Sequence, residues 1–417
     1  MSQIKIKNFG PIKAGNPEND GWMDIKKVTV FIGNQGSGKS SVAKLISTMK
    51  WIEKVLVRGD YKIEEFTNNS RFRKIYCGYH GIDDYFFDIN QKDIAEIGYR
   101  GDAYTLYYQN GQLKIEETHP TRIYELPQTM YVPAERNFIS TISDLKLIKI
   151  SSDALSEFLN EYNDAKKEIK KSLKLPINDT EIEYDNFIDM IYIKGADYRV
   201  PLNRASSGFQ SFVPLYLVSW YLANAVKEQS ENTQNMSSEE LSRFKRGIAT
   251  IWADNSLTDE QRRAALSVLS SKFNKTAFIN IVEEPEQNLF PSSQRQMLNS
   301  LLAFNNMETG NELIITTHSP YIITYLSIAI QGDYLNKKIG NDVKWRTLIT
   351  RLNEVVPVNS IVAATDVAVY QLDDAGNIMK LPDYEGIPSD NNYLNASLAD
   401  GNQLFGSLLE IEQDYER

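Results

Sequence analysis

The octapeptide Gly33-Asn34-Gln35-Gly36-Ser37-Gly38-Lys39-Ser40 follows directly behind the apolar run Val28–Ile32. It fits the phosphate-binding pattern G-x-x-x-x-G-K-[ST] at every required position. Glycines let successive backbone N–H groups face one oxyanion, which a Cβ atom would obstruct. Residues 41–49, beginning with Ser41, are predicted to form a helix whose N-terminus adds its dipole to the same site. The sequence therefore predicts a strand, a phosphate-binding loop and a helix, in that order.

Two side chains of this loop carry chemistry. Lys39 is expected to reach the β- and γ-phosphates of a nucleotide, and the Ser40 hydroxyl to hold Mg²⁺. A glycine-rich turn that matches the pattern by chance is the alternative, but the presence of both residues behind a strand disfavours it. We therefore expect a nucleotide to bind here together with Mg²⁺.

Composition indicates an ordinary globular protein. The chain has 417 residues, enough for two or three domains or for one domain with large insertions, and 42% of them are hydrophobic. The N-terminus has no apolar segment typical of a signal peptide, and the longest apolar run, 214–226, is too short to span a bilayer. A single cysteine, Cys77, excludes an internal disulfide framework and favours a reducing cytoplasm.

The net charge of −10 argues against broad, sequence-independent binding of nucleic acid. Two small basic groups, Arg71–Lys74 and Lys166–Lys174, are candidates for a local basic groove. For each of them a solvated surface is the simpler interpretation. Nucleic acid is thus a possible partner that the overall charge does not indicate.

The N-terminal part is predicted to hold a mainly antiparallel β lobe. Residues 4–12 alternate apolar and polar side chains and stop at Gly10-Pro11. Residues 75–132 are rich in Tyr, Ile and Phe, and Asn110-Gly111 between two apolar runs is a strong hairpin signal. We expect this lobe to close on Met130-Tyr131-Val132.

The middle of the chain is predicted to be largely helical. Apolar residues at three-to-four spacing over 152–171 indicate a helix, expected as an arm or lid outside the sheet. A second strand-bearing part is expected to begin near Phe187 and to run to Gly208, before an apolar helix over 212–227. Capping boxes at Ser237-x-x-Glu240 and Thr258-x-x-Gln261 predict an inserted helical module, and a closing helix is expected from about Asn402.

These boundaries predict an α/β chain with five parts. They are an N-terminal part of the nucleotide-binding domain with the loop and the β lobe (1–137), a helical arm or lid (138–186), a segment with Ser207-Gly208 (187–227), a helical insertion (228–274) and a C-terminal part (275–417).

An apolar strand over 276–282 ends in Glu283-Glu284-Pro285. In a nucleotide hydrolase, the first acid supports the Mg²⁺ shell and the second orients or deprotonates the attacking water. Adjacent residues of a strand point to opposite sides, so the two acids cannot share one role. Such a strand end is usually a solvated terminus, and only the phosphate loop makes the functional interpretation the better one.

Two further segments complete the candidate site. A short apolar strand, Leu313–Thr317, delivers His318, which could sense the γ-phosphate or position water. Ser206-Ser207-Gly208 stands at the start of the apolar helix, where backbone N–H groups could face an anion. A histidine satisfied by local backbone bonds and a simple N-cap are the respective alternatives.

The order of these motifs resembles the ABC-type ATPases of the SMC/RecF/OLD branch. Tyr131-Val132-Pro133-Ala134-Glu135-Arg136 and the segment 283–291 are similar to one group within it, the stand-alone OLD-like ATPases of bacterial anti-phage systems such as the Septu and PARIS types. The resemblance covers nearly the whole chain, although the arm and the insertion are not diagnostic. It implies an ABC-type fold, ATP and Mg²⁺ as cofactors, and a head-to-tail homodimer.

The resemblance also implies a role for each motif. Lys39 and Ser40 would form the phosphate and Mg²⁺ site, Glu283 would support the metal, and Glu284 would be the catalytic acid. His318 would be the switch histidine, and Ser207 with Gly208 the signature that contacts ATP bound to a partner subunit.

The sequence departs from the family in two places. Phe209 stands where transporter ATPases usually have a second glycine of the signature, and Phe290 where many relatives have histidine. Both put the details of the dimer interface in doubt. The glutamine that the family carries in its first lobe has Gln128 as a weak candidate.

Several functions compete for this site. The first is an ATPase that senses infection or acts as a scaffold, and controls a separate effector, a nuclease or a toxin. The second is a RecF-like ATPase of DNA repair or recombination that acts directly on DNA. A transporter subunit would need closer spacing between signature and acidic strand, and a small-molecule kinase would need neither signature nor switch histidine.

Neighbouring genes would discriminate best between the first two functions.

The C-terminal part lacks the Glu and Asp-x-Asp set that a TOPRIM-like nuclease would need. Its pair Asp373-Asp374 is better explained as part of a turn that continues to Gly376-Asn377.

Overall fold

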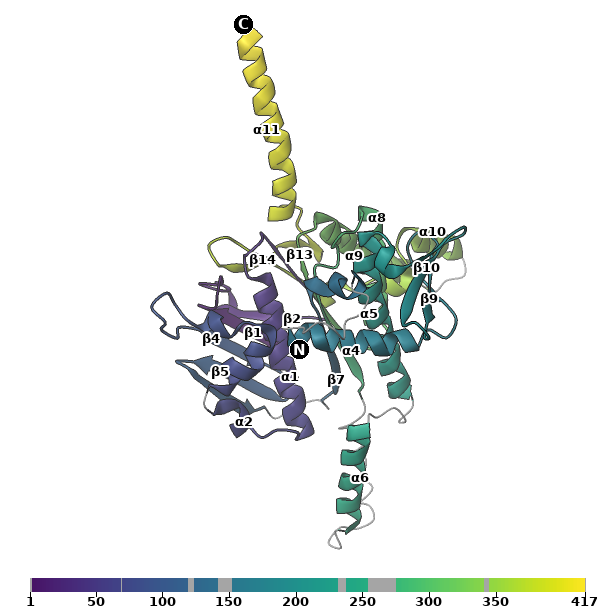
Figure 1. Cartoon of the computed structure of the whole chain (residues 1–417). Helices are drawn as coiled ribbons and strands as arrows, with labels where there is room; N and C mark the ends of the chain where they lie inside the picture. The colour runs from purple at the N-terminus through teal and green to yellow at the C-terminus, as the bar shows by residue number, and fades with distance from the viewer. Residues whose placement is uncertain are drawn as a thin grey trace.

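The computed structural model describes residues 2–68, 70–118, 124–141, 152–231, 238–253, 275–340 and 345–416. A six-stranded sheet with the order β15-β14-β3-β13-β12-β7 lies at the centre (Figure 1). All its strands run parallel except β15 at the edge. The strands are β3 (Val28–Gly33), β7 (Pro127–Val132), β12 (Ala277–Glu283), β13 (Glu312–Thr317), β14 (Val367–Leu372) and β15 (Ile378–Lys380).

The central strands are buried on both faces because helices cover both sides of the sheet. Every residue of β3 and of β12 is buried. Successive side chains of β12 alternate between two cores: Ile281 packs with α1, whereas Val282 packs with the helices of the opposite face. The covering helices are α1 (Lys39–Arg58) on one face and α4 (Asp153–Lys167), α5 (Ser207–Glu231), α8 (Pro291–Asn305) and α9 (Pro320–Ile339) on the other.

An antiparallel lobe with the order β2-β1-β4-β5-β6 stands beside α1 (Figure 1). Asn110 and Gly111 both have positive φ and connect β5 to β6, as the hairpin signal predicts. We expected the lobe to close on Met130-Tyr131-Val132, but this expectation is wrong. These residues lie in β7 and pair with β12 in the parallel sheet. The lobe strands are β1 (Ser2–Lys7), β2 (Trp22–Ile25), β4 (Glu96–Arg100), β5 (Tyr104–Gln109) and β6 (Gln112–Glu117).

Helix α4 corrects the expectation of an arm or lid that lies outside the sheet. Ser152 caps the helix by accepting a hydrogen bond from the Leu155 N–H at 3.2 Å. Phe158 is fully buried, and α4 packs against α5 and β7. Its apolar stripe therefore belongs to the main core, which is the simple packing that an amphipathic pattern most often signifies.

The second strand-bearing part begins before Phe187, contrary to expectation. Phe187 lies in the turn between β9 and β10 and is 96% exposed, so its apolar character does not mark a buried strand. Its N–H donates to the Asp185 carboxylate at 3.0 Å, which is the turn chemistry of an Asp two residues earlier. The small sheet consists of β8 (Leu173–Lys174), β9 (Glu181–Asp185), β10 (Met190–Lys194) and β11 (Arg199–Pro201).

Two helices project from the body at opposite ends of the molecule (Figure 1). One is α6 (Ser238–Ala253), within the predicted insertion; the second capping box, at Thr258, lies outside the described residues. The other is α11 (Tyr393–Glu416), which begins well before the expected Asn402 and exposes Leu404, Phe405 and Leu408. Among the described helices, none combines the length and the apolar character that a membrane crossing requires.

The remaining helices and strands are short. They are α2 (Glu64–Thr67), α3 (Phe138–Thr141), α10 (Arg346–Val355), the strand pair β16 (Asp383–Tyr384) and β17 (Ile387–Pro388), and several single helical turns. The predicted fold class, α/β with a phosphate loop, an antiparallel lobe and helical additions, is confirmed.

Candidate active site

The phosphate loop connects β3 to α1 at the carboxyl edge of the parallel sheet. A Cβ atom at Gly33 would lie 2.4 Å from the Leu372 carbonyl oxygen, and one at Gly38 2.9 Å from Ile12 Cγ1. Both positions also have positive φ, so they require glycine for conformation and for space. Gly36 also has positive φ but faces open space, and residues 34–36 are exposed. The loop is therefore tight at its two ends and open in the middle, where a phosphate would approach.

Lys39 is the first residue of α1 and its side chain folds back over the loop. Its Nζ donates to the carbonyl oxygens of Gly33 at 2.9 Å and of Asn34 at 2.8 Å. Burial lowers the pKa of Lys39 to about 8, and Glu284, Glu286 and Glu283 partly offset that decrease. The ammonium group thus contacts two carbonyls and lies in the field of three carboxylates, and negatively charged phosphates would be stronger partners than the carbonyls.

The loop residues fit a nucleotide with Mg²⁺. The Ser37 hydroxyl is buried and has no hydrogen-bond partner, as expected of a donor that awaits an oxyanion. Ser40 is partly exposed at the start of α1, where its hydroxyl could reach a metal ion. No group of three or more His, Cys, Asp or Glu side chains in the described part of the chain could hold a metal. Mg²⁺ at this loop would take the Ser40 hydroxyl and phosphate oxygens of the nucleotide as ligands, with Glu283 acting through water.

Glu283 ends β12 and is held from the neighbouring strand β7. Tyr131 donates its hydroxyl hydrogen bond to Glu283 Oε1, and the Ala134 N–H donates to Glu283 Oε2 at 3.2 Å. The Glu283 side chain is only 5% exposed. Its carboxylate is therefore fixed in one orientation, which suits a group that acts on a metal through water.

Glu284 follows β12 directly and has a different environment from Glu283. Its φ is +44°, a conformation that non-glycine residues rarely adopt, and its N–H donates to the Thr316 carbonyl at 2.9 Å. Its side chain is 35% exposed, and Oε1 lies 3.5 Å from His318 Nε2. The carboxylate can thus accept a proton from water, with the imidazole next to it.

His318 follows the apolar strand β13, as the sequence predicts, and the structure places its imidazole beside Glu284. Burial lowers the pKa of the imidazole and the nearby Lys39 charge lowers it further, whereas Glu284 partly offsets the decrease; the net effect favours the neutral ring. Its backbone N–H donates to Glu286 Oε1 at 2.7 Å. Burial raises the pKa of Glu286. Glu286 therefore links the acidic segment to the histidine strand, a role that the sequence analysis did not assign to it.

Ser207 is exposed at the start of α5, and this helix start packs on the loop that follows Glu284. A Cβ atom at Gly208 would lie 3.2 Å from the Asn288 carbonyl oxygen, and the Asn288 amide donates to the Ser211 hydroxyl at 2.9 Å. Glycine at position 208 thus permits a close contact with the acidic segment. Ser207 remains accessible to another molecule.

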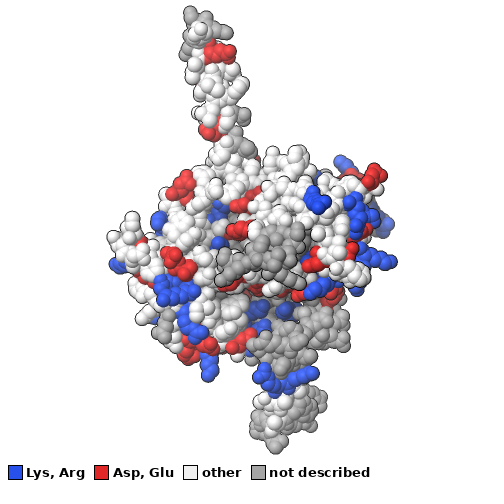
Figure 2. Space-filling view, in the orientation of Figure 1, with Lys and Arg blue, Asp and Glu red and all other residues white. Residues whose placement is uncertain are grey.

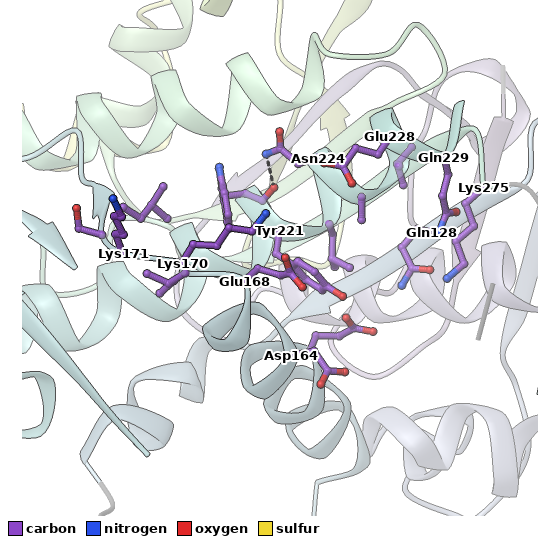
Figure 3. Close-up of a pocket in the computed structure, with 18 residues that line it drawn as sticks. Gln128, Asp164, Glu168, Lys170, Lys171, Tyr221, Asn224, Glu228, Gln229 and Lys275 are labelled. Carbon is purple, nitrogen blue, oxygen red and sulfur yellow. Dashed lines mark hydrogen bonds between the residues drawn. The ribbon is translucent and has the colours of Figure 1, made fainter. Parts of the chain in front are cut away.

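Gln128 does not lie at this site, which corrects its candidacy. It is the second residue of β7 and pairs with Phe278, near the amino end of the parallel strands, whereas the phosphate loop lies at the carboxyl end. There it lines a cavity of about 970 Å³ together with Lys275, Asp164 and Tyr221 (Figure 3). Only the register of β7 against β12 reveals this position.

Sequence analysis missed three residues that shape the site. Tyr131 donates a hydrogen bond to Glu283. Arg136 is fully buried and donates to the backbone carbonyls of Glu283 and Glu284. The third residue is Asp374, whose two carboxylate oxygens accept from the Asn34 amide nitrogen at 3.0 and 3.1 Å. Tyr131 was expected only as part of a strand, and the resemblance of the segment 131–136 to one family group gave neither Tyr131 nor Arg136 a role. Asp373, by contrast, forms the expected turn, accepting from the Asn377 N–H at 2.8 Å.

One part of this chain matches a known protein family. The family described as AAA ATPase domain matches residues 260–323, which contain Glu283, Glu284 and His318. Comparison with curated proteins gives no significant match.

Solved structures that match this chain include an SMC head bound to the C-winged helix domain of ScpA (10% identity, 91% of this chain and 96% of that chain, TM-score 0.35). An SMC head domain from Thermotoga maritima is 12% identical, with coverage of 92% and 98% and a TM-score of 0.33. A dimeric ATP-binding cassette bound to ADP and Pi is 10% identical, with coverage of 92% and 100% and a TM-score of 0.29. At these TM-scores the likeness carries no weight for function. The phosphate loop, the acidic strand and the family match together show that this chain is a P-loop ATPase.

Proposed function

We propose that this ATPase acts in the cytoplasm as the sensor or scaffold of an anti-phage defence system, of the stand-alone OLD-like type, and controls a separate nuclease or toxin. The observation that supports this subtype is the contact between the two segments that carry the resemblance. Tyr131, Ala134 and Arg136 of the first segment hydrogen-bond to Glu283 and Glu284 of the second. In this proposal ATP and Mg²⁺ bind at Lys39 and Ser40, Glu283 supports the metal, and Glu284 activates water.

We further propose a head-to-tail homodimer in which Ser207 and Gly208 contact ATP on the partner subunit. Exposed apolar side chains near the site support this arrangement: Phe290 is 75% exposed and Tyr321 44% exposed. Helix α8, which follows Phe290, and helix α9, which contains Tyr321, are joined, because the Ser319 hydroxyl donates to the Gln294 amide oxygen at 2.6 Å. A second copy would bury these aromatic rings together with the helix start at Ser207.

Ser207→Arg is expected to lower the ATP turnover number at least about tenfold while leaving the fold intact. An arginine side chain at an exposed helix start fits the monomer but clashes in a packed subunit interface, and a tenfold loss corresponds to about 1.4 kcal/mol. Steady-state hydrolysis measured over a range of protein concentrations checks this prediction.

Ser397→Arg, an equally exposed position on α11, is the matched control and should behave as wild type. A turnover number per chain that stays constant down to a demonstrated wild-type monomer would refute the shared site.

The second candidate function is a RecF-like ATPase that acts directly on DNA. Lys and Arg form separate groups on the face shown in Figure 2. Within one basic group, Lys166 pairs with Asp189 at 2.6 Å and Lys167 with Asp164 at 2.7 Å. These carboxylates reduce the positive charge that the basic group could present to DNA phosphates. We therefore rank the DNA function second. Tight, salt-resistant duplex binding by the purified protein would reverse that ranking.

Deletion of residues 237–274, bridged by a short Gly/Ser linker, is expected to preserve ATP binding and to abolish protection against phage. The described part of this insertion, α6, projects away from the phosphate loop, so its removal leaves the nucleotide site in place (Figure 1). We propose that the insertion contacts the effector. Nucleotide affinity and plating efficiency of phage, measured with the effector gene present, check the two halves. Full protection by the deleted protein would contradict this role.

A further inference from the structure

The short segment between β7 and α4 contains an arginine with an unusual set of partners. Arg136 is fully buried, and all four of its hydrogen bonds go to backbone carbonyl oxygens. Its guanidinium donates to Glu283 at 2.7 Å, to Glu284 at 2.6 Å, to Pro133 at 3.2 Å and to Ser211 at 3.4 Å. One side chain thereby joins the end of β12, the end of β7 and the first turns of α5.

Only a guanidinium can make this set of contacts. Its planar fork carries five N–H donors, whereas a lysine ammonium carries three on a single atom. Burial lowers the pKa of Arg136 to about 10, and the nearby Glu286, Glu284 and Glu283 partly offset that decrease. The side chain therefore stays charged at neutral pH, and the carbonyl dipoles solvate the charge in place of water.

Ser140, from the same segment, holds the same part of α5. Pro214 lies inside α5 and lacks an N–H, so the Gln210 carbonyl loses the helical donor four residues ahead. The Ser140 hydroxyl donates to that carbonyl at 2.9 Å and replaces the missing bond. Arg136 and Ser140 together form a clamp on two successive carbonyls of α5, those of Gln210 and Ser211. We call it the 136/140 clamp.

The clamp connects two parts of the site that the chain itself separates widely. On one side it fixes the carbonyl of Glu284, whose backbone has the uncommon φ of +44°. On the other side it fixes the helix start that carries Ser207 and Gly208. The Asn288 amide adds a second tie between the two sides, because it donates to the Ser211 hydroxyl at 2.9 Å.

We propose that Arg136 is a positioning residue for hydrolysis, which keeps the Glu284 backbone and the start of α5 in one rigid arrangement. Contact of Ser207-Gly208 with a nucleotide is thereby coupled to the alignment of the Glu284 carboxylate on water. This inference rests on the proposed role of the Ser207 segment. It predicts that loss of the clamp impairs turnover far more than ATP affinity, since Lys39 and the phosphate loop make no contact with the clamp that the structure records.

The test compares Arg136→Lys and Ser140→Ala with Ser219→Ala. The last variant is a matched control: Ser219 is also a buried serine, and its hydroxyl accepts from the Asn280 amide at 3.0 Å, farther along α5 and away from Glu284. We expect Arg136→Lys to lower kcat at least about tenfold and Ser140→Ala about threefold, with the Kd for ATP within about threefold of wild type. Ser219→Ala should keep kcat even if it lowers the melting temperature.

Three measurements make the outcomes decisive: kcat, the Kd for ATP by calorimetry, and thermal unfolding. Unchanged kcat in Ser140→Ala and in a folded Arg136→Lys overturns the proposal, and so does an equal loss of kcat in Ser140→Ala and Ser219→Ala. If Arg136→Lys fails to fold, Ser140→Ala decides alone. Failure of the shared dimer site would show separately, as wild-type turnover that does not depend on protein concentration.

Discussion

Lys39→Ala is expected to abolish ATP binding at any concentration used in ordinary assays. The Lys39 ammonium is the cation that the structure places at the phosphate loop, where its Nζ lies 2.9 Å from the Gly33 carbonyl oxygen. A charge-assisted hydrogen bond contributes about 1.5–3 kcal/mol, and the ammonium can donate two or more to phosphates, so Kd should rise at least about 100-fold. Calorimetric titration with a non-hydrolysable ATP analogue and Mg²⁺ measures this effect without interference from turnover.

Lys54→Ala is the appropriate control, because Lys54 lies on the same helix α1, near its far end. It should bind the analogue as wild type does. Equal affinity of wild type and Lys39→Ala would refute the assignment of the phosphate loop, whatever the effect on hydrolysis.

Glu284→Gln is expected to bind ATP normally and to lose turnover. The amide is nearly isosteric with the carboxylate, but it cannot accept the proton of the attacking water, and general bases contribute about 10²–10⁴-fold to kcat. The Glu284 side chain lies 3.5 Å from His318, whereas Lys39 Nζ donates to the carbonyls of Gly33 and Asn34. The substitution therefore leaves the hydrogen bonds of Lys39 in place. Single-turnover hydrolysis together with analogue binding separates the two effects.

Glu135→Gln provides the matched change from carboxylate to amide on an exposed residue of the neighbouring segment, and kcat should be preserved. A Glu284→Gln variant that hydrolyses ATP at a rate within about threefold of wild type would exclude Glu284 as the base. Glu283 or a water network would then have to accept the proton.

The sequence by itself determined the local parts of the site. Loop, lysine and serine are consecutive, so their chemistry depends on backbone conformations that Gly33, Gly36 and Gly38 alone permit. The acidic pair and the histidine end apolar runs, and the carboxyl ends of parallel strands meet at one edge, which brings His318 within 3.5 Å of Glu284. Apolar runs and glycine patterns were therefore sufficient for an α/β chain with a phosphate loop and for these candidates, whereas the ABC-type fold was expected from the resemblance.

Tertiary structure alone decided what lies between the motifs. The place of β7 beside β12 depends on strand pairing, so neither the Tyr131 contact to Glu283 nor the exclusion of Gln128 could be read from the chain. An amphipathic stripe has the same pattern in a core helix as in a lid. The sequence therefore could not show that α4 packs in the core rather than outside the sheet. Arg136 resembles any surface arginine in the sequence, and only the convergence of four carbonyl groups, from separate parts of the chain, makes its burial favourable.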